Sequence, residues 1–142
     1  MKCPRDGTEL QQVRAGGIQL DKCHLCDGMW FDPGELDKLT ASGIIHIETA
    51  VESEFGNPPV KTGRVTGYMR CPRCGEAGRL HQYQYTYLKP VLVDRCDSCL
   101  GIWLDRNELD AIIGEKKTLE EAEAQGQFHK FANAFLHFWR KK

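Results

Sequence analysis

An internal repeat constrains the fold of this chain more than any other feature of its sequence. Each copy begins with Cys-Pro-Arg, at residues 3–5 and again at residues 71–73. Each copy then continues with Cys-x-x-Cys-x-Gly-x-Trp-x-Asp and ends in Glu-Leu-Asp, at residues 23–37 and 96–110. The two copies differ mainly in the length of the segment between these halves. The 142-residue chain therefore contains two tandem copies of one small unit.

The spacing of the cysteines indicates metal binding rather than disulfide bonding. Six of the seven cysteines lie in Cys-x-x-Cys pairs, and an odd total fits a disulfide framework poorly. The sequence has no apolar run long enough for a signal peptide or a membrane span, so we expect a protein of the reducing cytoplasm. In that compartment, paired cysteines separated by a hairpin are typical of structural zinc sites.

The second copy offers a complete set of four thiolate ligands. Its two cysteine pairs are separated by a predicted β-hairpin, which would bring the four sulfur atoms into a tetrahedron around zinc. The predicted ligands are Cys71, Cys74, Cys96 and Cys99.

The first copy lacks one of these cysteines. Cys3, Cys23 and Cys26 are present, but Asp6 occupies the position that corresponds to Cys74. A carboxylate oxygen can bind zinc, so Asp6 is the first candidate for the fourth ligand. Water or a group from a partner is the second candidate, and His24, inside the Cys-x-x-Cys turn, is the third. We expect two zinc ions per chain.

The predicted fold class is a small, metal-stabilised α+β protein. Each copy should form a zinc ribbon of one β-hairpin and one short helix, and neither copy is large enough to bury a substantial core alone. The expected divisions are a first ribbon over 1–43, a linker over 44–69, a second ribbon over 70–114 and a C-terminal helix over 115–142. The first helix should stop near Gly43, and the second should pause at Gly114.

The ends of the two repeats predict local roles for several side chains. Asp32 and Asp105 precede Glu35 and Glu108 by three residues, which is the pattern of a helix N-cap and capping box. We therefore interpret these acidic residues as caps rather than catalytic groups. The tryptophan that recurs at the same offset in both copies is expected to close a ribbon core and shield the thiolates.

These motifs resemble the zinc ribbon of the transcription factor IIB type, as found in small bacterial proteins. The pattern of that family is C-P-x-C-G, a hairpin, and then C-x-x-C-x-G-x-W-x-D-x-x-E-L. Residues 71–109 match every motif position, and residues 3–36 depart from it only at Asp6. The resemblance implies a zinc-binding, non-catalytic module whose relatives are associated with transcription.

The C-terminal segment predicts an amphipathic helix. Four Lys or Arg residues and no acidic residue follow Gly126, and an aromatic stripe at helical spacing occupies one face. This face could pack on the ribbons or on a second copy of the chain, dock into a partner, or lie on a membrane surface. The candidate partner-binding residues are Phe128, Phe131, Phe135, Phe138 and Trp139.

The sequence favours a binding module that contacts a protein or nucleic-acid partner. The net charge of −1 gives no overall attraction for nucleic acid, so a protein partner is at least as well supported as DNA. No catalytic constellation was found, and we expect no enzymatic activity. Two alternatives stay open: a zinc enzyme or a metal- or redox-handling protein that uses a labile site at Cys3, Asp6, Cys23 and Cys26, and a membrane-surface or self-assembling adaptor that uses the C-terminal helix.

Overall fold

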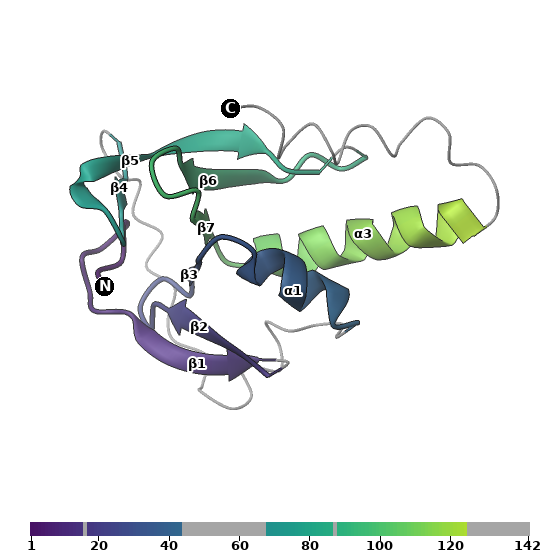
Figure 1. The fold of residues 1–142 in the computed structure, drawn as a ribbon, viewed down its shortest axis with the longest axis horizontal. Helices are drawn as coiled ribbons and strands as arrows, with labels where there is room; N and C mark the ends of the chain where they lie inside the picture. Colours follow the sequence, from purple (N-terminus) through teal and green to yellow (C-terminus); the bar gives the residue numbers. More distant parts are fainter. Residues whose placement is uncertain (16, 44–67, 87, 125–142) are drawn as a thin grey trace.

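The two repeats build one curled antiparallel sheet with two helices, an α+β arrangement (Figure 1). The computed structural model describes residues 1–15, 17–43, 68–86 and 88–124. The predicted linker over 44–69 lies largely outside these ranges, and the predicted C-terminal helix lies outside them from residue 125 onward. None of the described helices is long and apolar enough to cross a membrane.

The elements of the two repeats follow the same order. The first repeat contains β1 (Gln11–Ala15), β2 (Ile18–Lys22), β3 (Met29–Phe31) and α1 (Glu35–Ala41). The second contains β4 (Arg70–Cys71), β5 (Gly75–Gln84), β6 (Leu92–Cys96), β7 (Ile102–Leu104) and α3 (Glu108–Ala124).

The two repeats meet through their short third strands. The strand order is β1-β2-β3-β7-β6-β5-β4, so β3 of the first repeat pairs with β7 of the second. Trp30 lies opposite Trp103 at the centre of this antiparallel pair, with Met29 opposite Leu104 and Phe31 opposite Ile102. The pairing relates the two strands by an approximate twofold axis that passes between the two tryptophans.

The alternation of β3 and β7 creates a different environment on each face of the sheet. Met29, Phe31, Ile102 and Leu104 face a shared apolar core that α1 and α3 cover. Trp30 and Trp103 face the other way, into a cluster with the cysteines. The apolar core contains Val13, Ala15, Leu20, Met29, Phe31, Leu36, Leu39, Tyr85, Val91, Val93, Ile102, Leu104, Leu109, Ile112 and Ile113.

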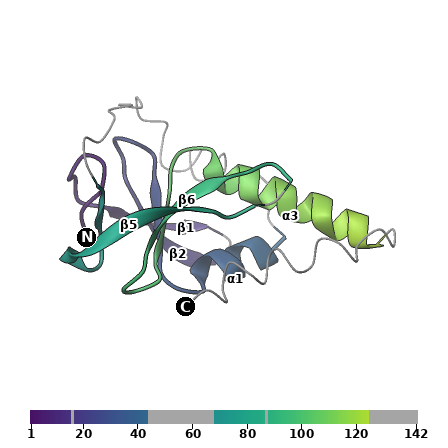
Figure 2. The ribbon, with the colours of Figure 1, turned by 90° about the horizontal axis from the view of Figure 1, so that it is seen from above.

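The two helices lie side by side next to the sheet in both views (Figures 1 and 2). The ammonium group of Lys116 on α3 donates a hydrogen bond of 3.4 Å to the hydroxyl of Thr40 on α1. The buried carboxylate of Glu115 accepts hydrogen bonds from the backbone N–H groups of Leu88 (2.7 Å) and Lys89 (3.0 Å). These bonds fix the loop between β5 and β6 against α3.

The helix boundaries differ from two local predictions. α3 continues through Gly114 to Ala124 without the expected pause, because Ile112, Ile113 and Leu119 are buried on both sides of that glycine. The first helix begins at Glu35 with Gly34 at the N-cap, so the prediction that Asp32 caps this helix is wrong. Glu35 does reach back to accept the Asp32 N–H at 2.9 Å, as in a capping box. The side chain of Asp32 is instead occupied by tertiary contacts described below.

Candidate metal centres

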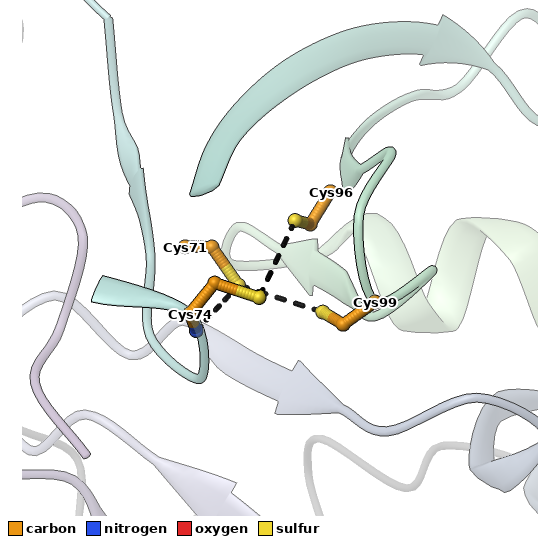
Figure 3. Close-up of side chains that lie close together, drawn as sticks. All are labelled: Cys71, Cys74, Cys96 and Cys99. Carbon is orange, nitrogen blue, oxygen red and sulfur yellow. Dashed lines mark hydrogen bonds between the residues drawn. The ribbon is translucent and has the colours of Figure 1, made fainter. Parts of the chain in front are cut away.

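Four cysteine sulfurs of the second repeat converge on one point (Figure 3). Cys71 and Cys74 lie in the turn that joins β4 to β5, and Cys96 and Cys99 lie in the turn that follows β6. The Sγ atoms of Cys71 and Cys99 are 3.6 Å apart, and those of Cys74 and Cys96 are 4.0 Å apart. A zinc tetrahedron with Zn–S bonds of about 2.3 Å requires sulfur separations of roughly 3.8 Å. The cluster therefore fits one zinc ion.

The first repeat forms an equivalent cluster from three cysteines and one aspartate. The Sγ atoms of Cys3 and Cys26 are 3.6 Å apart, and Asp6 Oδ2 lies 3.3 Å from Cys23 Sγ. The other carboxylate oxygen of Asp6 accepts the Thr8 N–H at 2.9 Å, which orients the side chain toward the cysteines. This cluster fits a second zinc ion, with Asp6 in the position of the fourth ligand.

His24 has less support than Asp6 as the fourth ligand. The side chain of His24 is exposed. The side chain that lies with the three cysteines, close enough to share one metal ion, is that of Asp6. Asp6 is itself exposed, whereas the three cysteines are buried. The carboxylate is thus the side of the first site that faces solvent.

The thiol chemistry of both clusters indicates that a cation belongs there. In the first cluster, the pKa of Cys26 is raised to about 12, mainly by a hydrogen bond with Cys23. Hydrogen bonds from Cys26 and Cys3 lower the pKa of Cys23, so one thiolate is favoured and further ones are opposed. In the second cluster, burial raises the pKa of Cys71. A divalent cation supplies the positive charge that allows all these thiols to ionise.

Backbone N–H groups point at the sulfurs in both clusters. The N–H groups of Arg5 and Leu25 lie 3.4 Å from the sulfurs of Cys3 and Cys23, respectively. In the second cluster, the N–H of Cys74 lies 3.3 Å from the sulfur of Cys71. Such donors stabilise thiolate charge and fix the ligand geometry.

Gly78 is a residue of the second site that the sequence motifs did not reveal. A Cβ atom at this position would lie 2.5 Å from Cys74 Cβ, 2.8 Å from Cys71 Cβ and 3.2 Å from Cys96 Sγ. Strand β5 can therefore pass beside the cysteines only with a glycine here. Gly78 lies outside the repeated pattern, so no comparison between the two copies indicated it.

Each repeat also contributes a tryptophan to the metal site of the other repeat. A Cβ atom on Gly28, in the first site, would lie 2.2 Å from the ring of Trp103. A Cβ atom on Gly101, in the second site, would lie 2.1 Å from the ring of Trp30. The space at each glycine is needed for the indole ring of the other copy. The tryptophans do shield the cysteines, as expected, in a shared buried cluster.

Two arginines cross between the repeats in the same reciprocal manner. Arg5, beside Cys3, forms a two-pronged ion pair with Asp105 of the second repeat. Arg73, beside Cys71, donates to Asp32 of the first repeat at 2.7 Å. Both arginines occupy the third position of Cys-Pro-Arg, so their recurrence was visible in the sequence although their partners were not.

Comparison with known proteins agrees with this geometry. The family profile described as a transcription factor zinc-finger, of the transcription factor IIB zinc-ribbon type, matches residues 2–42 and 70–115, which is more than half of the chain. The chain belongs to the transcription factor IIB-type zinc-ribbon family. The resemblance stated from the motifs is therefore confirmed. No curated protein and no solved structure gave a significant match.

The two matched segments each contain one of the clusters, which confirms the expected cofactors as two zinc ions. Zinc supplies a fixed tetrahedral crosslink in such ribbons. Seven thiolates and one carboxylate of the chain would bind the two ions, four ligands to each. The two tryptophans shield the cysteines from water, and the crossed arginines hold the ligand turns. The predicted partner-binding residues of the C-terminal helix lie outside the described residues, and their role stays a prediction.

Proposed function

We propose that this protein is a non-catalytic binding module, in which two zinc-stabilised ribbons present a surface to a protein of the transcription machinery. The observation that carries the proposal is that each cluster has enough side chains to fill all four coordination positions of a zinc ion. Each cluster offers four protein ligands, which is the arrangement of structural zinc, whereas catalytic zinc sites keep a position open for water or substrate. The description of the family as a transcription factor zinc-finger supports a partner in transcription.

The charges of the described surface favour a protein partner over nucleic acid. Phosphate binding requires arginines and lysines that are free to neutralise the backbone. Five arginines among the described residues are instead held in ion pairs with carboxylates: Arg5, Arg70, Arg73, Arg95 and Arg106. These pairs would have to break before the arginines could contact phosphate.

A cleft of about 630 Å³ between the two Cys-Pro turns is the candidate contact surface. Met1 and Tyr68 line it and are 42% and 48% exposed, respectively. The guanidinium of Arg79 lies 3.9 Å from the centre of the Tyr68 ring, which holds this aromatic group in place. Exposed, fixed aromatic side chains are frequent anchors in protein interfaces.

Titration of the fluorescently labelled chain with purified RNA polymerase from its own organism tests the proposal. We expect saturable binding that is lost after zinc chelation. Tyr68→Ala should weaken binding at least about tenfold, whereas the control Leu92→Ala, which removes an equally exposed residue from β6, should not. Absence of binding, or equal effects of both variants, would contradict the proposed surface.

Labelled DNA and RNA provide the competing arm of the same experiment. We expect no tight binding at low salt. Binding that weakens steeply with salt would show phosphate contacts and would replace the protein partner with nucleic acid.

A metal-handling role is the second candidate, because the first site has an exposed carboxylate where the second has a thiol. The variant Asp6→Cys separates the two candidates. A structural site should retain polymerase binding and hold zinc more tightly, whereas a site that must release metal should lose its function. The adaptor role of the C-terminal helix stays a separate prediction, which liposome co-sedimentation of the full chain and of a chain truncated before Gly126 would test.

A further inference from the structure

We propose that the two zinc sites bind metal with positive cooperativity, and that Arg5 and Arg73 are the positioning residues that couple them. This inference goes beyond the proposed function, since it concerns only the metal sites and the contacts between the repeats. The proposal depends on contacts that cross between the repeats. The tryptophan and aspartate that follow the cysteines of one site contact the ligand turns of the other site.

The first half of the arrangement supports the first site. Two residues of the second repeat, Trp103 and Asp105, contact both ligand turns of this site. Asp105 binds Arg5 in the turn that carries Cys3, and the ring of Trp103 covers Gly28 in the turn that carries Cys23 and Cys26. The backbone oxygen of Gly28 accepts the Cys23 N–H at 2.9 Å, so the position of Gly28 is part of the ligand turn itself.

The second half mirrors the first. Asp32 accepts a hydrogen bond of 2.7 Å from the guanidinium of Arg73, which lies in the turn that carries Cys71 and Cys74. The ring of Trp30 covers Gly101, whose backbone oxygen accepts the Cys96 N–H at 2.9 Å. Within each repeat the indole N–H also binds the aspartate two residues later, at 3.2 Å from Trp30 to Asp32 and at 3.0 Å from Trp103 to Asp105.

The supporting residues are tied to the metal site of their own repeat by sequence. Trp103 and Asp105 follow Cys99 by four and six residues, and Trp30 and Asp32 follow Cys26 by the same spacing. Metal binding at one site therefore orders the strand that carries the support for the other site. When the second metal binds, that strand is already ordered, so the entropy cost of ordering it is not incurred again. This saving is the physical origin of positive coupling.

A third contact joins the ligand turn of the first site to the second repeat. Asp27, directly after Cys26, is buried and pairs with Lys22 of its own repeat. Arg106, two residues before α3, reaches the same carboxylate at 3.7 Å. The corresponding position in the second repeat is Leu100, so this contact adds to the coupling from one side only.

Titration of the metal-free full chain with Co²⁺ tests the coupling directly. The absorption bands of cobalt differ between a site with four thiolates and a site with three thiolates and a carboxylate, so the two sites can be followed separately. We expect both sets of bands to grow in a fixed ratio from the first addition. Independent filling, with the four-thiolate site complete before the other begins, would overturn the proposal without any mutation.

The variant Arg5→Ala/Arg73→Ala assigns the coupling to the arginines. We expect its titration to separate into two steps, with the four-thiolate bands first and the affinity of the other site lowered at least about tenfold. The control Arg14→Ala, which removes an exposed arginine from β1, should keep the fixed ratio. Arg5→Lys/Arg73→Lys should restore part of the coupling, because lysine retains the charge but not the two-pronged geometry. A fixed ratio in the double alanine variant would show that the arginines do not carry the coupling.

Discussion

Gly28 and Gly101 are glycines because an indole ring occupies the space where a side chain would begin. Glycine is common in tight turns, so the sequence alone would attribute such a glycine to the turn that contains it. Here the ring comes from the other repeat, at 2.2 Å from the position of an added Cβ in one site and 2.1 Å in the other. A single methyl group at either glycine would therefore force the two repeats apart.

Gly28→Ala should destabilise the protein by about 1–3 kcal/mol, the typical cost of overpacking a buried site. Denaturant unfolding in excess zinc measures this change. Gly114→Ala is the matched control, since a Cβ at this helical position meets nothing within 4 Å. We expect it to stabilise α3 by about 0.5–1 kcal/mol. Similar effects of the two variants would contradict the crossed packing.

Asp32 and Asp105 show what a local capping pattern cannot predict. Each precedes a glutamate by three residues, and this spacing alone satisfies the capping pattern. Asp32 does not cap its helix, and both aspartates accept hydrogen bonds from a tryptophan of their own repeat and an arginine of the other repeat. The capping pattern contains no information about these distant partners, so only the structure could reveal them.

The start of α3 places several carboxylates close together. Glu108 accepts the Asp105 N–H at 2.8 Å, and Asp94 lies on the neighbouring strand opposite Trp103. Burial is the main cause that raises the pKa of Glu108 to about 7, and the charges of Asp105 and Asp94 add to it. The helix of the second repeat thus begins at a carboxyl group that titrates near neutrality.

This pKa predicts a pH dependence of stability. The ordinary pKa of a glutamate is 4.5, so between this value and about 7 the folded chain retains a proton that the unfolded chain has lost. The contribution of Glu108 to stability therefore falls as pH rises through this window and becomes constant above it. Between about pH 6 and pH 8 we expect a loss of roughly 1 kcal/mol from this group.

Comparison of Glu108→Gln with the wild-type protein isolates that contribution, because glutamine does not ionise and zinc binding affects both proteins alike. The variant should lose less stability than the wild-type protein over the same pH range in denaturant unfolding. Glu35→Gln is the equivalent change in the first repeat. Burial also raises the pKa of Glu35, but this group is more exposed, so its effect should be smaller. Parallel pH profiles for Glu108→Gln and wild type would contradict the assignment.

Among the described residues, the two repeats share one large apolar core instead of each forming its own. Residues of β1, β2, β3 and α1 share it with residues of β5, β6, β7 and α3, and the central strands pair across the repeats. The expectation that each copy is too small for its own core is consistent with this arrangement. Metal binding is nevertheless not the only source of stability, because each repeat contributes apolar side chains to the core that both repeats share.

A shared core and a shared sheet predict a single unfolding transition. Far-UV circular dichroism reports the strands and helices of both repeats, and tryptophan fluorescence reports the interface at Trp30 and Trp103. In zinc-saturated protein, both signals should change at the same denaturant concentration. Two separated transitions would indicate that the repeats unfold independently.

The sequence predicted which residues form the two clusters, because the repeat aligns them. Cys74 and Asp6 could be compared directly, and both clusters formed from the residues expected. The pairing of the repeats could not be predicted in this way. A repeated motif reads the same whether each tryptophan packs within its own copy or across to the other, and only the β3–β7 register distinguishes the two cases.

The antiparallel match of Trp30 with Trp103 has the geometry of a self-complementary dimer interface contained in one polypeptide. In a dimer of identical chains, every substitution appears in both halves at once. Covalent fusion removes that restriction, so one half can exchange a thiolate for the carboxylate of Asp6 while the other keeps all four sulfurs. Fusion thus allows a symmetric scaffold to carry two chemically different ligand sets.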